Sequence, residues 1–403
     1  MNVLFLTTIL PRQQRMGSEV ASQCFIDALR QTGHRVLTVG YMRQDDPFEL
    51  ERSEVLIAQR YIETQRAKGY PLLWMLLGLA KGLPYSGVKY YSQRYIQQVK
   101  KLLHQSEQPF HLVIIDHPQL GWLQPFLPPQ QKLVMIAHNL EHQLYRQQAA
   151  LSSRVMQWIY RREARLIEQI ETDLAHEADQ VWALSQTDAE YFSKLGQKTL
   201  TMTLPANLSP MRTRLQPKAF DIGLIGSWAW KPNEESLRWF LQFVYPLLPQ
   251  HLSIQVAGRG AEWLTERYPQ IRYLGFVPDA QVFMGQARAV AIPTLSGSGI
   301  QIKTLDAITS GSKIVATPVA LRGLNNWPTT VQVAEQPQQF ATALLAACAS
   351  QSIDQSIGQS MNQESSEYVS GSSADIDFAQ STEWYRNRQI KFLAEISEAV
   401  SNL

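Results

Sequence analysis

Short apolar runs alternate with longer segments of helical periodicity along most of this chain. The opening shows the pattern, with an apolar run over 2–8, helical spacing over 18–31 and a second apolar run over 35–40. A strand, a crossover helix and a second strand imply parallel pairing. The alternation continues through the apolar runs 112–115, 133–137, 181–184 and 200–204. The first half of the chain is therefore predicted to form a doubly wound α/β domain.

The same pattern begins again after residue 217. A short apolar run over 221–226 is followed by a helical stretch with Leu237 and Phe240 on its apolar face. A second sheet is completed by the runs 252–257, 288–292, 313–316 and 330–334. We therefore predict an N-terminal domain over 1–205 and a second domain over 218–349. The residues between them, 206–217, are the predicted hinge.

The C-terminal end has a different composition. The segment 350–375 is rich in Ser and Gln and has few large apolar residues. Such a segment buries too little surface to offset the entropy of ordering it, so we predict a flexible loop. Helical spacing returns over 376–403 through Phe378 and Ile390, and this helix is expected to dock on another part of the protein.

Composition narrows the functional class. A chain of 403 residues with 45% hydrophobic content is long enough for two cores. The net charge is +2, from 37 basic and 35 acidic residues, and this balance argues against a nucleic-acid surface. Cys24 and Cys348 are too few for a disulfide framework or a cysteine zinc site, which favours a reducing compartment. Because 1–10 is apolar without a basic n-region, we interpret it as a strand and expect a cytoplasmic protein.

The segment 296–324 is the strongest candidate for a functional site. Gly297 and Gly299 allow a turn whose N–H groups approach a ligand closely. The helix expected to begin near Ile300 would direct its positive end to the same place, and Gly311 would end it. This order is typical of a phosphate site. Loops rich in Gly and Ser also join strands to helices in α/β proteins that bind nothing there.

From Pro293 onwards this segment reads PTLSGSGIQIKTLDAITSGSKIVATPVALRGL. It resembles the donor-nucleotide segment of the family-4 retaining glycosyltransferases, in the subgroup patterned P-x-x-x-G-G-G-x-R-x-K-x-L-E-A-M. The resemblance implies a GT-B fold, in which two doubly wound Rossmann-like domains face an interdomain cleft. It also implies that the last helix, here 376–403, completes the first domain. The nucleotide sugar is expected on the second domain and the acceptor on the first, at the C-terminal ends of parallel strands.

Cationic and glycine residues are expected to hold the donor diphosphate. The loop GSWAWKPN over 226–233 is similar to the family's G-S-x-x-W-x-P-N element. The resemblance implies that its lysine neutralises the leaving group, where negative charge develops; a solvated loop lysine is the alternative. The residues that the resemblance assigns to the diphosphate are Gly17, Lys231, Gly297, Ser298, Gly299, Ile300 and Lys303.

Two residues, Asp306 and Arg259, are expected to bind the nucleoside of the donor. Asp306 corresponds to the second of two family glutamates, eight positions apart, which binds the ribose hydroxyls. It is one methylene shorter than glutamate. The first glutamate falls at Ser298, and no carboxylate replaces it locally. Lys303 would share a helix face with Asp306, so it would either reach the phosphate or pair with that carboxylate.

Candidate residues of the first domain follow its strands. Gly17-Ser18 stands where the family has a Gly-Gly loop, although a plain turn is the competing interpretation. His117, in IIDHPQLGW, matches the family's cleft histidine near the donor sugar and is the predicted catalytic residue; a structural histidine is the alternative.

The stretch HNLEH over 138–142 resembles the family's H-N-x-E element. Because it is not H-E-x-x-H, we expect no metal. The acceptor or cleft residues are then Ser18, His138, Asn139 and Glu141.

The sequence therefore predicts a glycosyltransferase that moves a sugar from a nucleoside diphosphate sugar to an acceptor hydroxyl with retention, in polysaccharide, glycolipid or glycoconjugate synthesis. No cofactor or nucleic acid is expected. A non-catalytic GT-B scaffold is one alternative, favoured by Ser298 and Asp306. A sugar-nucleotide epimerase is another, although no acid/base carboxylate pair is visible. The apolar segment 71–91 either contacts a membrane peripherally or packs against the first domain.

Overall fold

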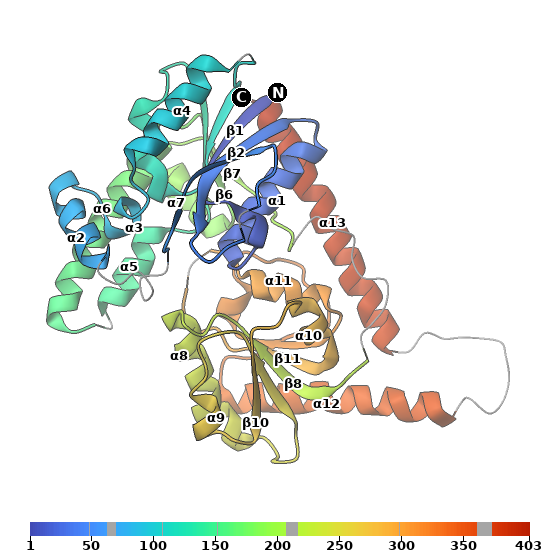
Figure 1. The fold of residues 1–403 in the computed structure, drawn as a ribbon. Helices are drawn as coiled ribbons and strands as arrows, with labels where there is room; N and C mark the ends of the chain where they lie inside the picture. Colours follow the sequence, from blue (N-terminus) through green and yellow to red (C-terminus); the bar gives the residue numbers. More distant parts are fainter. Residues whose placement is uncertain are drawn as a thin grey trace. The chain divides into compact units, whose positions relative to one another are not determined.

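The computed structural model describes residues 1–47, 49–62, 70–106, 108–150, 152–206, 217–297, 299–360 and 373–403. The chain divides into two compact units (Figure 1). Unit 1 comprises Met1–Leu208, Ser298–Ile300 and Ile390–Leu403, and unit 2 comprises Ser209–Gly297 and Gln301–Gln389. Apart from its two end residues, the predicted hinge over 206–217 lies outside the described residues.

Unit 1 is built on a parallel sheet with the strand order β3-β2-β1-β4-β5-β6-β7. Its strands are β1 (Asn2–Ile9), β2 (Arg35–Arg43), β3 (Glu54–Arg60), β4 (Leu112–Ile115), β5 (Lys132–Ala137), β6 (Gln180–Ala183) and β7 (Thr199–Thr201). The order reverses between β1 and β4, which creates a topological switch point at their C-terminal ends. The strands β1, β4 and β5 are nearly continuous apolar runs because helices cover both faces of the sheet.

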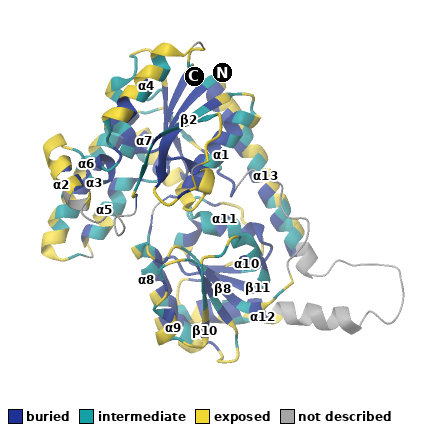
Figure 2. Ribbon diagram, in the orientation of Figure 1, coloured by how far each residue is buried: buried dark blue, intermediate teal, exposed yellow. Residues whose placement is uncertain are grey.

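Helices surround this sheet and supply the rest of the unit 1 core. They are η1 (Pro11–Gln13), α1 (Gly17–Gln31), α2 (Tyr70–Lys81), α3 (Tyr85–Val88), α4 (Gln93–Gln105), η3 (Pro118–Phe126), α5 (Glu141–Ala150), α6 (Arg154–Glu177), α7 (Gln186–Lys194) and the end of α13 (Ser373–Ser401). Figure 2 shows the buried strands at the centre of the unit and exposed residues along the outer helices. On one face Phe25 of α1 stacks on Trp182 of β6, with ring centroids 5.9 Å apart.

Unit 2 repeats the plan with the parallel order β10-β9-β8-β11-β12-β13. The strands are β8 (Phe220–Ile225), β9 (Ile254–Ala257), β10 (Ile271–Gly275), β11 (Ala287–Ile292), β12 (Lys313–Ala316) and β13 (Val331–Val333). The helical segments are α8 (Lys231–Trp239), η4 (Phe240–Val244), η5 (Tyr245–Leu247), α9 (Leu264–Arg267), α10 (Ala280–Gln286), α11 (Ile302–Thr309), η6 (Pro318–Leu321), α12 (Pro337–Ser360) and the start of α13. The switch point of this sheet lies between β8 and β11.

The two doubly wound sheets confirm the predicted fold class, but two of the observed strands were not predicted from the hydrophobic pattern. They are β3 and β10, at the edges of their sheets. Only Ile57 of β3 and Ile271 of β10 are buried. An edge strand that covers little of the core carries few apolar residues, so the pattern gave no signal there.

The Ser- and Gln-rich segment differs in part from the expected flexible loop. Helix α12 continues through 350–360 and α13 begins at Ser373, whereas 361–372 lies outside the described residues. Gln and Ser do not interrupt a helix that has already formed, because each next residue adds a hydrogen bond to an existing turn. Poor core-forming composition therefore does not by itself exclude helical backbone.

The long helix α13 makes contacts within both units. Its residues up to Gln389 belong to unit 2, where Asp377 forms an ion pair with Lys313. Its residues from Ile390 belong to unit 1, where the ring of Phe392 meets that of Phe25 edge to face, with centroids 5.2 Å apart. Glu395 accepts hydrogen bonds from the backbone N and Oγ1 of Thr203, at 2.6 and 2.7 Å.

Candidate functional site

The glycine-rich turn follows β11 of unit 2; its Gly297 is assigned to unit 2 and its Gly299 to unit 1. Gly297 has a φ of +136° and Gly299 a φ of +67°, so both adopt conformations that favour glycine. The side chain of Arg322 donates a hydrogen bond to the carbonyl of Gly297. Helix α11 begins at Ile302, two residues after the expected start near Ile300, and Ser298 lies outside the described residues.

The two donor-site elements predicted from separate parts of the sequence are hydrogen-bonded to each other. Lys303 Nζ donates to Asn233 Oδ1 at 3.1 Å, and Asn233 Nδ2 donates to the carbonyl of Ser227 at 3.1 Å. The backbone N of Leu295 also donates to Ser236 Oγ of α8, at 3.3 Å. The GSWAWKPN loop and the glycine turn therefore lie together beyond β8 and β11, where open α/β sheets bind ligands.

Lys303 and Asp306 have shifted pKa values on the same helix. Burial disfavours the charge of Lys303 and lowers its pKa to about 8. Burial also raises the pKa of Asp306 to about 7; a hydrogen bond from Gln281 lowers it in part, and the negative charge of Asp279 raises it further. No ion pair joins Lys303 to Asp306 in the described structure. The partner of this lysine is Asn233, which leaves its charge available to a ligand.

The other two cationic candidates are on the surface. The Lys231 side chain is 63% exposed and pairs with Glu235 at 3.8 Å across one turn of α8. The exposed Arg259 lies over the ring of Phe276, with its guanidinium carbon 4.9 Å from the ring centroid. The exposed Lys231–Glu235 ion pair contributes little to stability, so it does not fix the Lys231 side chain in place. Both residues follow the C-terminal ends of their strands, Lys231 after β8 and Arg259 after β9.

Tight backbone packing orders the loop that carries Lys231. The backbone N of Trp228 donates to the carbonyl of Arg259 at 2.8 Å, and its indole Nε1 donates to that of Ala257 at 2.8 Å. Gly258 has a φ of +107°, and a Cβ there would lie 1.8 Å from the carbonyl oxygen of Gly226. The loops after β8 and β9 thus pack backbone against backbone, which requires glycine at this position.

In unit 1, the candidate site centres on Asp116, directly after β4. Its carboxylate is fully buried and accepts hydrogen bonds from Thr7 Oγ1 and Ser22 Oγ, both at 2.7 Å. His138 Nε2 lies 2.9 Å from the other oxygen. Burial alone would raise the pKa of this carboxyl, but His117, His138 and the Ser22 hydrogen bond lower it to about 2.

Asp116 also brings together two residues that were predicted from separate motifs. His117 Nε2 lies 3.4 Å from Asp116 Oδ2, and the His117 and His138 rings stack with centroids 4.2 Å apart. Burial lowers the pKa of His117 to about 3, so its imidazole is neutral at neutral pH. The sequence interpretation did not select Asp116. Its position immediately before His117, at the end of a buried strand, was the available signal.

This cluster also has a spacing that suits metal ligands. The ligand atoms of Asp116, His117 and His138 all lie within 4.8 Å of one another. However, Asp116 already accepts hydrogen bonds from Thr7 and Ser22 and is bonded to His138. The Asp116 carboxylate is therefore satisfied within the protein, and its hydrogen bonds account for the position of His138 in the cluster.

In the HNLEH stretch over 138–142, some polar groups have hydrogen-bond partners within the protein and one buried acceptor has none. His142 is buried and its Nδ1 lies 2.6 Å from Glu171 Oε2, while the backbone N of Glu141 donates to Glu171 Oε1 at 2.7 Å. Burial raises the pKa of Glu141, as does the charge of Glu171. In contrast, Asn139 Oδ1 is buried and has no hydrogen-bond partner among the described residues. A buried acceptor left without a partner is a candidate contact for a ligand.

Gly17 and Ser18 form the first turn of α1, and Met16 is the N-terminal cap. Both are exposed, and the carbonyl of Ser18 accepts a hydrogen bond from Ser22 Oγ at 2.9 Å. Through Ser22 this turn is joined to Asp116. The exposed N–H groups at the start of the helix remain compatible with a role in binding an anion.

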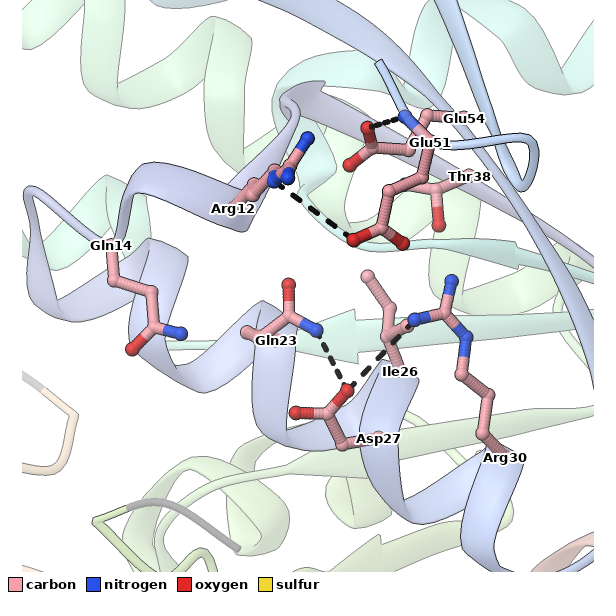
Figure 3. A pocket seen from close by; sticks show the side chains of 9 residues that line it. All are labelled: Arg12, Gln14, Gln23, Ile26, Asp27, Arg30, Thr38, Glu51 and Glu54. Carbon is pink, nitrogen blue, oxygen red and sulfur yellow. Dashed lines mark hydrogen bonds and ion pairs between the residues drawn. The ribbon is translucent and has the colours of Figure 1, made fainter. Parts of the chain in front are cut away.

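A separate polar pocket of about 190 Å³ lies on unit 1 between α1 and β2 (Figure 3). Arg12 and Glu51 face each other across it, 3.9 Å apart, and Gln23 donates to Asp27 at 2.7 Å. None of the predicted site residues lines this pocket. It is therefore distinct from both groups of candidate residues.

Comparison with known proteins supports the resemblance. Residues 219–350 match a family model described as "Glycosyl transferases group 1". Among curated protein sequences, none matches the chain significantly.

Similar solved structures cover the whole chain. They include Anabaena Alr3699/HepE in complex with UDP-glucose, at 15% identity, 100% of both chains and a TM-score of 0.59. The catalytic domain of Arabidopsis thaliana starch synthase IV, bound to ADP and acarbose, has 12% identity over 98% of this chain and 99% of that one, with a TM-score of 0.56. The lipopolysaccharide outer core galactosyltransferase WaaB has 11% identity over 100% of both chains and a TM-score of 0.55. At such identities the similarity concerns the fold, which is GT-B.

Proposed function

We propose that this protein transfers a sugar from a nucleoside diphosphate sugar to an acceptor hydroxyl with retention of anomeric configuration. The observation that carries the proposal is the Lys303–Asn233 hydrogen bond, which joins α11, the helix after the glycine turn, to the GSWAWKPN loop beyond β8 and β11. The match of 219–350 to group 1 glycosyltransferases covers both elements. The complex of Alr3699/HepE with UDP-glucose supports a nucleotide-sugar donor. A variant of S. aureus TarM was solved with UDP and α-GlcNAc-glycerol and supports a hydroxyl acceptor; it is 13% identical over 77% of this chain and 58% of its own, with a TM-score of 0.51.

Residues of unit 2 and of the glycine turn after β11 would bind the donor. With a pKa of about 8, Lys303 is mostly protonated at pH 7 and would stabilise the charge that develops on the diphosphate. The N–H groups of the turn at Gly297 and Gly299 and the start of α11 at Ile302 would face the same group. Asp306, when ionised, would accept hydrogen bonds from the ribose hydroxyls. The exposed side chains of Lys231 and Arg259 would be ordered by the ligand.

Residues of unit 1 would position the sugar and the acceptor. His117 is neutral at pH 7, so it would orient the transferred sugar through a hydrogen bond rather than as a cation. Asp116 holds His138 against it, and Asn139 offers an unsatisfied acceptor atom. In the proposed front-face reaction, the leaving phosphate takes the acceptor proton. Catalysis would come mainly from positioning and charge stabilisation, without a metal.

We extend the proposal to acceptors of polysaccharide, glycolipid or glycoconjugate synthesis and to a cytoplasmic location. A non-catalytic GT-B scaffold is the second candidate. Asp306 favours it, because this carboxylate is shorter than the family's glutamate and is neutral in about half of the molecules at pH 7.

Isothermal titration calorimetry with UDP, GDP and ADP tests the donor site. We expect one nucleotide to bind, and Lys303→Met to weaken its binding at least about tenfold because a charge-assisted phosphate contact is lost. Arg272→Met, at an exposed position of β10, is the matched control and should bind as wild type does. Failure of all three nucleotides to bind would reject a donor site.

Turnover is tested separately from binding. Hydrolysis of the corresponding nucleotide sugar, followed by NMR of the released sugar before it mutarotates, is expected to give the anomer of the donor. Nucleotide binding without hydrolysis or transfer would favour the scaffold. Release of the opposite anomer would contradict retention.

A further inference from the structure

Helix α2 of unit 1 presents an apolar face to solvent. Leu76 is 58% and Leu79 61% exposed, and Leu73, Met75 and Leu77 on the same helix are exposed as well. The opposite face is anchored by Trp74, which is buried and whose ring lies 5.8 Å from that of Tyr85. Figure 2 shows α2 at the outside of the unit, with most of its length exposed. A continuous apolar surface of this kind usually marks an interaction site.

The first half of α6 also carries exposed residues, and its exposed charged side chains are all arginines. Trp158 is 67% and Val155 71% exposed. Arg154, Arg161 and Arg165 are exposed too, and they lie four residues before, three after and seven after Trp158, which places them on its face of the helix. No acidic residue occurs between 154 and 162. In the described part of the chain, these three arginines have no ion-pair partner.

Hydrogen bonds hold the two helices together. Arg162 of α6 donates to the carbonyl of Gly78 in α2 at 3.3 Å. Glu163 accepts a hydrogen bond from the backbone N of Tyr85, in α3, at 2.5 Å. Figure 1 shows α2 and α3 beside α6. The apolar face of α2 and the arginine-tryptophan face of α6 therefore belong to one region of unit 1, which we call the α2–α6 surface.

We propose that the α2–α6 surface docks on an anionic lipid bilayer. Leucine and tryptophan side chains enter the boundary between headgroups and acyl chains, whereas arginines contact lipid phosphates. The charge pattern selects this partner. A second copy of the chain would bring three arginines against three arginines, while an anionic membrane neutralises them.

Docking would be peripheral. No helix in the described part of the chain is long and apolar enough to cross a membrane. The surface is also narrower than the sequence range 71–91, because Val88 and Tyr90 are buried in unit 1. The surface includes instead the first half of α6, which is distant from α2 in the sequence. The proposal does not depend on sugar transfer, since it concerns side chains outside both groups of candidate site residues.

Vesicle flotation with the full chain tests the proposal. We expect binding to vesicles of equal parts phosphatidylglycerol and phosphatidylcholine, little binding to phosphatidylcholine alone, and a marked decrease in high salt. A variant with Leu76→Ser and Leu79→Ser should bind at least about tenfold less. A variant with Arg154→Gln, Arg161→Gln and Arg165→Gln should lose its preference for anionic vesicles. Circular dichroism and the melting temperature check the folding of each variant.

Matched controls on unit 2 carry the same chemical changes. Phe243→Ser removes another exposed apolar side chain, and Arg267→Gln with Arg272→Gln removes exposed charges. Both control variants should float with anionic vesicles as the wild type does. The proposal is overturned if wild type fails to float, if folded surface variants float unchanged, or if light scattering shows a dimer that only the Leu76→Ser, Leu79→Ser variant dissociates.

Discussion

His117 shows at the residue scale how burial controls a side chain's charge. Its pKa is about 3 in the folded protein and near 6.5 ordinarily. Between these pH values the unfolded chain binds a proton at this position and the folded chain does not. Stability is therefore lost as the pH falls through this window, by up to about 1.4 kcal/mol per pH unit.

We accordingly expect His117→Gln to flatten the acid side of the stability profile. Glutamine does not titrate, so the proton uptake that favours the unfolded chain is removed at this position. Urea denaturation at several pH values between about 7 and 4 measures the change. A profile as steep as that of the wild type would show that His117 remains protonatable in the folded protein.

Lys303 and Asp306 predict how donor binding varies with pH. Binding needs the lysine protonated and the aspartate ionised, and their pKa values are about 8 and about 7. Affinity for a nucleotide sugar should therefore be greatest between these values and fall on both sides. Calorimetry across this pH range tests the profile.

Two variants separate the limbs of that profile. Lys303→Arg should keep binding at higher pH, because a guanidinium does not deprotonate in this range. Asp306→Asn should remove the acid limb, with weaker binding throughout because the carboxylate is lost. If neither variant altered the profile, the titrating groups would lie elsewhere.

At the scale of elements, the loops after β8 and β9 depend on glycine. A Cβ at Gly258 would overlap the carbonyl oxygen of Gly226, and its φ of +107° is also unfavourable for other residues. We expect Gly258→Ala to lower the free energy of unfolding by about 3 kcal/mol or more, since backbone must move. Gly275→Ala is the control: its φ is +66° with nothing within 4 Å, so only about 1 kcal/mol should be lost. Equal losses in urea denaturation would contradict the packing argument.

Helix and strand boundaries illustrate what local pattern can predict. The strand at 112–115 was predicted with its observed bounds, and α1 within one residue of its start. Periodicity is a local property, so it is visible wherever an element faces a core. The edge strands β3 and β10 were missed because most of their residues are only partly buried.

At the scale of the whole molecule, unit 1 relies on residues from the end of the chain. Phe392 is fully buried against Phe25, whereas Ile390 on the same helix is 60% exposed. We expect Phe392→Ala to lower the free energy of unfolding by about 3–5 kcal/mol, because a large cavity is created. Ile390→Ala should change it by less than about 0.5 kcal/mol. Urea denaturation followed by tryptophan fluorescence compares the two variants, and similar values would argue against a structural role for this end of α13.

Two doubly wound sheets and a glycine turn before a short helix could be predicted from the amino-acid sequence, because periodicity and the conformational freedom of glycine are local properties. Which polar groups meet depends on the three-dimensional fold. Asp116 and His138 are 22 residues apart in sequence, and Asn233 and Lys303 are 70 apart. These contacts depend on which strands end side by side, and burial there sets the pKa values. The pattern could name His117 and Lys303, but the fold supplied the partners that give each its charge and position.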